Sequence, residues 1–206
     1  MIVSEERVKE FGEVFTPDSI VCDMLNLVDK QYNNISDTEY INRTFLEPTC
    51  GDGQFLLRIL YNKLLRVSKL PIEERELALV KAVCSVYGVD INEDNVLVAR
   101  RRLQKLIFGQ CVRSFDIKGV NYIQVDTGIK LSSKLKSIII SILENNIQTG
   151  NTLDNNLELY EYVFDNDFVS LNKMDIHSDI IYSTSDRVRY TELLDILSDS
   201  SESYTF

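Results

Sequence analysis

One short segment constrains the fold of this chain more than any other. Residues 45–56 read Phe-Leu-Glu-Pro-Thr-Cys-Gly-Asp-Gly-Gln-Phe-Leu. A short apolar strand ends in the acid Glu47, a tight turn holds Gly51 and Gly53, and a helix is expected from Gln54. Glycines one residue apart let the backbone approach a ligand where a Cβ atom would collide. The segment therefore predicts a strand–turn–helix unit with a ligand at the turn.

A second acid follows at the end of the next expected strand. Residues 85–91 form a β-rich run that ends near Asp90, and Asn92 begins an amphipathic helix. A carboxylate in this position can accept both ribose hydroxyls of an adenosine. In dinucleotide enzymes the ribose-binding acid follows the glycines by about 20 residues. Here a helix-like segment (72–84) places Asp90 farther along the chain, and Leu56 stands where the third glycine of the dinucleotide motif would be. The pattern disfavours a nicotinamide or flavin cofactor. The alternative to any ligand site at Asp90 is an ordinary strand–loop–helix junction with a surface aspartate.

The acid and the two glycines together point to a cofactor class. Acid-x-x-x-Gly-x-Gly at 47–53 resembles the first motif of S-adenosylmethionine-dependent methyltransferases. That cofactor carries a cationic amine and a sulfonium and has no phosphate, which suits an acid at the strand end. The resemblance implies that Glu47 holds the amine, directly or through water, and that Asp90 binds the ribose. Pro48 and Ile91 are then expected among the cofactor-binding residues.

Two flanking segments extend the resemblance to about three quarters of the chain. Gly-Glu-Val-Phe-Thr-Pro at 12–17 resembles the cofactor-clamping segment of adenine-N6 DNA methyltransferases, especially modification subunits of restriction systems. In that family the aromatic and the threonine contact the cofactor, which here implies Phe15 and Thr16. Residues 146–153 resemble the following strand end, where an Asp meets the adenine amino group. Asn151 stands in its place and could accept that hydrogen bond through its amide oxygen.

The resemblance fails at the catalytic loop. The family carries Asn/Asp-Pro-Pro-Tyr/Phe after its fourth strand, where polar groups accept the hydrogens of the amine and the aromatic stacks on a flipped base. This chain has no Pro-Pro pair. The nearest remnant is Asp-Asn-Asp-Phe after the strand-like segment 160–164, which leaves Asp165 and Phe168 as the catalytic candidates. A plain acidic turn is the alternative.

Strand and helix patterns alternate, which predicts an α/β fold: a parallel sheet with helices on both faces and a ligand at the carboxyl ends of the strands. The resemblance implies a Rossmann-like methyltransferase fold, abbreviated at the C-terminus. We expect one domain over 1–197, in which 1–43 is a helical segment with the cofactor clamp, and an acidic, serine-rich tail at 198–206. The expected helices are 17–30, 54–67, 72–83, 92–108 and 135–143, the strands are 44–47, 85–90, one near 147 and 160–164, and 109–133 is an irregular insertion.

Composition indicates a soluble globular protein. Hydrophobic residues make up 44% and charged residues 26% of the chain, and no apolar stretch approaches the ~20 residues of a membrane span. The charged N-terminus does not resemble a signal peptide. The four cysteines are widely spaced without a Cys-x-x-Cys pair, so neither a metal site nor a disulfide framework is suggested. These features predict a cytoplasmic protein without a membrane partner.

The net charge of −10 is distributed unevenly. Residues 100–136 hold nine basic residues against two acids, whereas 151–206 hold twelve acids against three bases. The overall charge opposes duplex binding by the whole surface. The basic stretch is either the solvated face of a helix or a strip that contacts DNA phosphates. The acidic end could dock on a basic partner protein.

Three functions fit these patterns. The first is an S-adenosylmethionine-dependent methyltransferase resembling adenine-N6 DNA methylases, with direct displacement at the sulfonium methyl. The second is a catalytically inactive, cofactor-binding protein that regulates, decoys or completes a DNA modification complex. The third is one part of a split enzyme whose partner protein supplies the catalytic or recognition half.

Overall fold

The computed structural model describes residues 16–30, 35–116, 119–153, 157–165, 168–174, 181–183, 188–192 and 194–195. The predicted tail at 198–206 and the candidate cofactor residue Phe15 lie outside these ranges. No described helix is both long and apolar enough to cross a bilayer.

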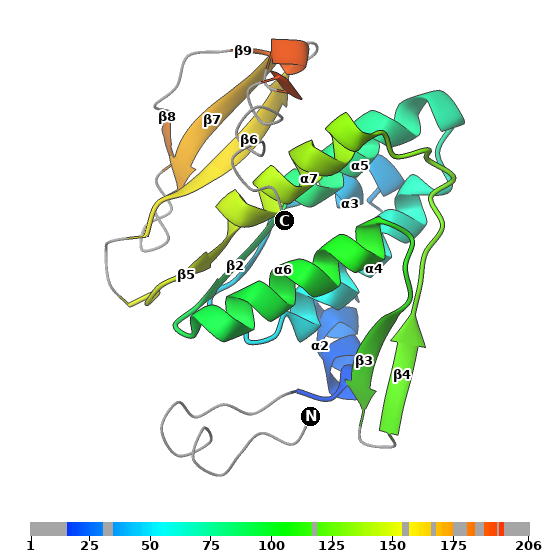
Figure 1. Ribbon diagram of the computed structural model, residues 1–206, viewed down its shortest axis with the longest axis vertical. Helices are drawn as coiled ribbons and strands as arrows, with labels where there is room; N and C mark the ends of the chain where they lie inside the picture. The colour runs from blue at the N-terminus through cyan, green and yellow to red at the C-terminus, as the bar shows by residue number, and fades with distance from the viewer. Residues whose placement is uncertain are drawn as a thin grey trace.

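Helices and strands alternate through the first three quarters of the chain, and strands follow (Figure 1). In chain order the elements are α2 (Asp18–Lys30), α3 (Asp37–Asn42), β1 (Phe45–Glu47), α4 (Gln54–Val67), the 3₁₀ turn η1 (Ile72–Glu74), α5 (Arg75–Cys84), β2 (Val86–Asp90), α6 (Glu93–Ile107), β3 (Val112–Asp116), β4 (Gly119–Ile123), α7 (Ser133–Asn146), β5 (Ile147–Thr149), β6 (Leu159–Asp165), β7 (Phe168–Met174), β8 (Ile181–Ser183) and β9 (Val188–Arg189).

A three-stranded parallel sheet, in the order β1–β2–β5, forms the centre of the fold. Glu47 pairs in register with Gly88, and Asp90 pairs with Thr149, so the three strands end at one edge. The spatial order follows the chain order, as in one βαβαβ half of a doubly wound sheet. The mixed α/β class and the three parallel strands at 44–47, 85–90 and near 147 are confirmed.

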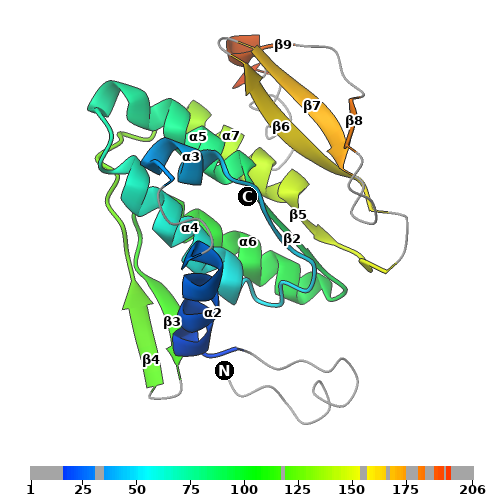
Figure 2. The same ribbon diagram turned by 180° about the vertical axis from the view of Figure 1, so that it is seen from behind.

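The helices pack against one face of this sheet. On β2, Val86 belongs to the large core built by the helices, and a Cβ atom at Gly88 would lie 2.6 Å from Leu56 Cδ1 of α4. Figures 1 and 2 show the helices gathered on this side. Successive right-handed crossovers in one direction along a sheet place their helices on the same face. The expectation of helices on both faces is wrong for the described residues.

The other face is covered by strands instead. Tyr87 and Val89 pack with Leu159 of β6, and the Tyr87 hydroxyl donates to the carbonyl oxygen of Tyr160 at 3.0 Å. β6 pairs antiparallel with β7, and β7 with β8 and β9, in a separate sheet. Segment 160–164 is therefore a strand, but the prediction that it is the fourth strand of the parallel fold is wrong. Only residues 150–158 connect β5 to β6, and a parallel crossover needs a dozen or more residues.

The predicted irregular insertion at 109–133 contains an antiparallel hairpin, β3–β4. Its two strands alternate: Val112 and Ser114 on β3 and Ile123 on β4 are buried. Arg113 on the opposite face is exposed. Glycine and charged residues in this segment obscured the alternation in the sequence.

Helix α3 is an element that the sequence reasoning missed. Ser36 and Glu39 form a capping box, in which the Ser36 hydroxyl accepts from the Glu39 amide and the Glu39 carboxylate accepts from the Ser36 amide. A serine followed by a glutamate three residues later is a recognised start signal for a helix. The helix ends at Asn42, and Arg43 and Thr44 connect it to β1.

A buried lysine joins α3 and β1 to the start of β2. The Nζ atom of Lys63, on α4, donates to the carbonyl oxygens of Tyr40, Ile41 and Arg43 at 3.1, 2.7 and 2.6 Å. It also lies 2.8 Å from the Ser85 hydroxyl. Lys63 has no exposed surface, so these contacts replace its hydration shell. The cluster sets the entry of the chain into the first strand.

We expect Lys63 to make stability depend on pH. Burial, with smaller contributions from the charges of Arg43 and Arg66, lowers the pKa of Lys63 from 10.5 to about 6. Between these values the unfolded chain holds a proton that the folded chain lacks, so the free energy of unfolding rises with pH, by at most about 1.4 kcal/mol per pH unit. Urea unfolding from pH 6 to 10 should show this rise, and Lys63→Met should flatten it. An equal slope in both proteins would contradict the lowered pKa.

Candidate functional site

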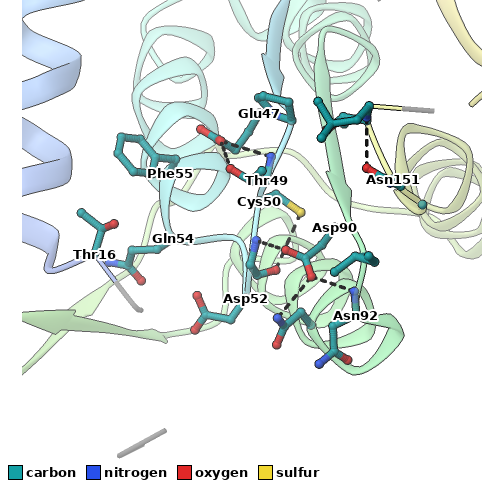
Figure 3. Close-up of a pocket in the computed structure, with 17 residues that line it drawn as sticks. Thr16, Glu47, Thr49, Cys50, Asp52, Gln54, Phe55, Asp90, Asn92 and Asn151 are labelled. Carbon is teal, nitrogen blue, oxygen red and sulfur yellow. Dashed lines mark hydrogen bonds between the residues drawn. The ribbon is translucent and has the colours of Figure 1, made fainter. Parts of the chain in front are cut away.

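Three predicted site residues meet at the carboxyl edge of the parallel sheet. Glu47 and Asp90 end neighbouring strands, and Asn151 follows β5 by two residues. All three line one cavity of about 610 Å³, together with Thr16 at the start of α2 (Figure 3). This volume is typical of small-molecule sites. The prediction that the two acids flank a common hollow is confirmed.

The two glycines of the turn have different roles. Gly51 lines the cavity and has φ +53°, and a Cβ atom there would meet nothing within 4 Å. Gly53 has φ +82°, and a Cβ atom there would lie 2.8 Å from the Cβ atom of Ala99 on α6. Gly53 is not among the residues that line the cavity. It allows α4 to begin against α6, whereas Gly51 gives the turn its left-handed backbone beside the open space.

Asp90 connects the glycine turn to the loop after β2. Its Oδ2 accepts from the Gly51 amide at 2.8 Å, and its Oδ1 accepts from the Asn92 amide at 2.9 Å and from Asn95 Nδ2 at 3.3 Å. A carboxylate has about four acceptor positions, so these bonds leave roughly one for a ligand. Asp90 therefore orders the cavity wall as well as presenting an acceptor to the cavity.

Glu47 is the less engaged of the two acids. Its Oε1 accepts from the amide and the hydroxyl of Thr49, both at 3.4 Å, which is long for a hydrogen bond. Burial raises the pKa of the Glu47 carboxyl above its ordinary value. It forms no ion pair with any residue that the structure describes. A partly desolvated carboxylate without a positive partner is stabilised by a cationic ligand.

The third strand end completes the cavity rim. The Gly150 amide donates to the Asp90 carbonyl oxygen at 2.9 Å, which holds the loop after β5 against β2. Asn151 Oδ1 accepts from the Leu153 amide at 3.0 Å, so its amide oxygen is already partly used. Ile91 and Leu153 line the same cavity with 63% and 85% of their surfaces exposed. They give the rim two apolar side chains that a flat ring could cover.

The charge of the lining limits the ligand class. The acids are Glu47, Asp52 and Asp90, and none of the described lining residues is Lys, Arg or His. Phosphate sites use basic side chains or clustered amide donors, so this lining is a poor match for a nucleotide polyphosphate. A ligand with a positive charge and hydroxyl groups fits it better.

Several lining residues were missed by the sequence reasoning. Phe55 is the second residue of α4, and its ring lies beside Glu47 in Figure 3. The position of Phe55 directly after the glycine turn was the sequence signal that could have identified it as a lining residue. Of the predicted cofactor residues, Thr16, Pro48 and Ile91 do line the cavity. The missed residues are Thr49, Cys50, Asp52, Gln54, Phe55, Asn92, Asn95, Gly150, Thr152 and Leu153.

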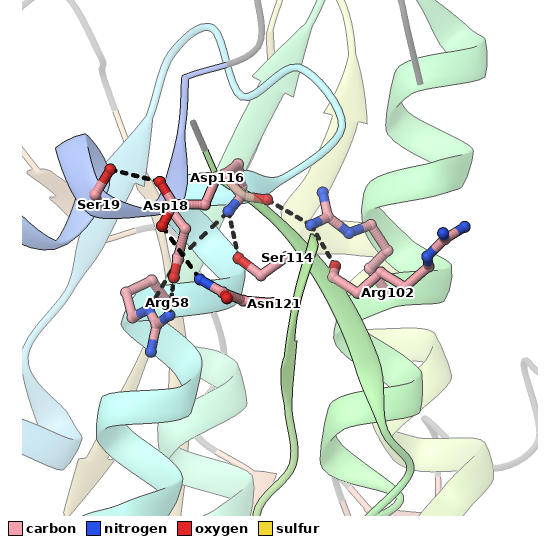
Figure 4. A network of polar contacts seen from close by, with 9 residues as sticks. Asp18, Ser19, Arg58, Arg102, Ser114, Asp116 and Asn121 are labelled. Carbon is pink, nitrogen blue, oxygen red and sulfur yellow. Dashed lines mark hydrogen bonds and ion pairs between the residues drawn. The ribbon is translucent and has the colours of Figure 1, made fainter. Parts of the chain in front are cut away.

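A buried polar network supports the wall on which Thr16 lies (Figure 4). Asp18 of α2 pairs with Arg58 of α4 through two contacts, one of them Arg58 Nε to Asp18 Oδ1 at 3.2 Å. Gln54 donates to Asp18 Oδ1 at 3.4 Å and accepts from Arg102 Nη2 at 2.5 Å. Arg102 in turn pairs with Asp52 Oδ2 at 2.7 Å. The network joins α2, α4 and α6 behind the cavity.

The catalytic candidates lie elsewhere. Asp165 and Phe168 pair with each other at the end of the β6–β7 hairpin. The preceding Phe164 lines a smaller cavity of about 210 Å³ with Thr44 and Ser85, which directly precede β1 and β2. That cavity is at the amino ends of the parallel strands, opposite the 610 Å³ cavity. The structure therefore does not bring Asp165 or Phe168 to the candidate site.

Other reactive groups give the site no further chemistry. Burial raises the pKa of the Cys50 thiol to about 12, so the thiol is protonated at neutral pH and is a weak nucleophile. Among the described residues, no cluster of three His, Cys, Asp or Glu side chains could hold a metal ion. The single histidine, His177, lies outside them.

No family model, no curated protein and no solved structure matches this chain. The geometry of the cavity is therefore the basis for the functional conclusion. That geometry combines two acids at the tips of neighbouring parallel strands, a left-handed glycine beside the open space and an apolar rim.

Proposed function

We propose that the protein binds S-adenosylmethionine in the 610 Å³ cavity and acts as a methyltransferase resembling adenine-N6 DNA methylases. One observation carries this proposal. Glu47 and Asp90 face the same cavity, and the part of its lining that the structure describes contains no basic residue. An adenosine that carries a sulfonium and an amine but no phosphate satisfies both features.

The lining divides into parts that suit parts of the ligand. Glu47, which has no positive partner among the described residues, would hold the amine, and the remaining acceptor of Asp90 would meet the ribose. Ile91 and Leu153 would cover the adenine ring, with Asn151 beside its amino group. Thr16 would approach the ligand from α2.

Bound S-adenosylmethionine supplies a methyl group that is electrophilic because it is attached to a positive sulfur. The residues of this chain would contribute by holding the ligand and excluding water, and transfer would depend on placing the acceptor nitrogen in line. The nitrogen would form a bond to the methyl carbon, the carbon–sulfur bond would break, and the amine would lose a proton to solvent.

A second function is favoured by the position of the catalytic candidates. Asp165 and Phe168 lie at the end of β6–β7, away from the cavity, and the parallel sheet is one half of a doubly wound fold. A cofactor-binding protein that regulates, decoys or completes a DNA modification complex needs no acceptor-holding loop of its own. A partner that supplies this loop would make the complex the active unit.

Calorimetry tests the shared premise. We expect S-adenosylmethionine to bind and ATP, whose phosphates carry negative charge, to give no measurable heat. Glu47→Gln should weaken binding about tenfold, the size expected for one charge-assisted contact. Glu73→Gln, which removes an exposed acid on η1, should leave the affinity unchanged.

The two functions are then separated by methyl transfer. Labelled methyl should pass to unmethylated DNA if the isolated chain is a methylase. Binding without transfer would support the second function. Absence of S-adenosylmethionine binding by folded protein at high concentration would exclude both.

A further inference from the structure

The β3–β4 hairpin is held rigidly beside the candidate site. Ser114 on its inner face accepts from Gln54 Nε2 at 2.6 Å, and Arg102 Nη2 donates to the Arg113 carbonyl oxygen at 3.0 Å. Near the turn, Asp116 Oδ1 accepts from the Ser19 hydroxyl at 2.6 Å. Gln54 also lines the cavity, so one side chain contacts both the cavity and the hairpin.

The opposite face of the hairpin is exposed at Arg113, Val120 and Tyr122, whereas Phe115 on the same face is half-buried. Arg113 pairs directly with Tyr122, and Phe115 with Val120, so these four side chains share one face of the ribbon, here called the outer face. Tyr122 is 62% exposed and Val120 is 40% exposed.

Three exposed cations lie on the hairpin and on helix α6, which contacts β3. Arg113, and Arg101 and Lys105 on the neighbouring helix α6, are exposed and form no ion pair with any described residue. The other two arginines of the α6 run are structural: Arg100 donates to the carbonyl oxygens of Glu144 and Ile147, and Arg102 belongs to the buried network. Of the basic strip predicted over 100–136, Arg101, Lys105 and Arg113 are thus the exposed cations of α6 and β3 without an ion pair among the described residues.

We propose that the outer face of the β3–β4 hairpin, with Arg101 and Lys105, binds single-stranded nucleic acid next to the cavity. Free cations track phosphates, and an exposed aromatic ring stacks on an unpaired base. A base inside a duplex is already stacked between its neighbours, so the contact with the Tyr122 ring favours a single strand. The net charge of −10 further opposes binding by large areas of surface, so contact must be local.

This inference extends the proposed function by naming the surface that receives the acceptor. It rests on that function for the role of the bound strand, but the binding itself needs no cofactor. The two can therefore fail separately. Gln54 joins the inner face of the hairpin to the cavity wall, so a strand on the outer face would lie across the ribbon from that wall.

Fluorescence anisotropy with a labelled 20-nucleotide single strand tests the proposal. Tyr122→Ala should weaken binding about tenfold, and Tyr122→Phe, which keeps the ring, should retain it. The triple variant Arg101→Ala/Lys105→Ala/Arg113→Ala should reduce the slope of log affinity against log salt by about 2. Tyr160→Ala/Arg189→Ala, which removes the same residue types from β6 and β9, is the matched control and should bind like wild type. All substituted side chains of the outer face are exposed, and unchanged thermal unfolding verifies the fold.

Equal affinity of the wild type and the hairpin variants for the oligonucleotide would overturn the proposal. An equal loss of affinity in the control variant would also overturn it, as would tighter binding of an acidic protein than of the oligonucleotide. Calorimetry with S-adenosylmethionine on the same samples separates the two conclusions. Cofactor binding without strand binding overturns only the hairpin proposal. Strand binding without cofactor binding supports the hairpin proposal and removes the methyltransferase.

Discussion

Asp90→Ala is expected to weaken S-adenosylmethionine binding by at least about 100-fold, or about 3 kcal/mol. The substitution removes the acceptor proposed for the ribose. It also removes three internal hydrogen bonds, from the amides of Gly51 and Asn92 and from the Asn95 side chain. Because those bonds hold the glycine turn against the loop after β2, the cavity wall should loosen together with the loss of contact.

Calorimetry on wild type and variant measures this effect, and Asp94→Ala is the matched control. Asp94 is an exposed acid in the first turn of α6, four residues from Asp90, and lies outside the cavity. Its loss should cost at most about 1 kcal/mol of stability and no affinity. Full affinity in Asp90→Ala would show that the second acid plays no part in binding.

Local elements of the fold could be predicted from the sequence. Helix α4 spans Gln54–Val67, as expected, because a glycine turn starts it and an apolar periodicity carries it through four turns. The buried face of α6, with Val96, Ala99 and Leu103, likewise follows from spacing alone. The convergence of Glu47 and Asp90 could be anticipated because the carboxyl ends of adjacent parallel strands share an edge.

Features that depend on pairing between distant residues could not be predicted from the sequence. Segment 160–164 has the composition of a strand, but composition does not give the direction of pairing or the partner. Its pairing with β7 follows from a short connection and a tight turn. The contact of Ser114 with Gln54 joins residues 60 positions apart, and no local pattern marks either as a partner. The different roles of Gly51 and Gly53 likewise depend on the position of Ala99.

The half-sheet architecture leaves the described site without a parallel strand on the far side of β1. The strand order β1–β2–β5 matches one half of a doubly wound sheet, and in complete folds of that kind ligands lie where the order reverses, beside the first strand. Beside β1 the described lining continues with Thr16, which precedes α2, instead of with a further parallel strand. In the proposed methyltransferase, the groups that hold the acceptor would come from this side of the molecule or from a partner.

Asp18→Ala is expected to destabilise the fold by about 3–5 kcal/mol, the cost of breaking a buried ion pair by removing one partner. Asp18 is 5% exposed and is the acceptor for both Arg58 and Gln54. Without it, the Arg58 guanidinium remains largely buried next to an apolar core. Urea unfolding monitored by circular dichroism measures the change in the free energy of unfolding.

Asp37→Ala is the matched control for this prediction. Asp37 also pairs with two cations, Arg66 at 3.5 Å and Lys69 at 3.8 Å, but it is 39% exposed, so its loss should cost under about 1 kcal/mol.

Replacing both Asp18 and Arg58 by leucine should recover much of the stability, since no charge is then left buried. This double variant should still bind S-adenosylmethionine more weakly than wild type. Thr16 lies two residues before Asp18 and reaches the cavity only if α2 is held against α4. Wild-type affinity in the double variant would mean that the position of α2 does not matter to the site.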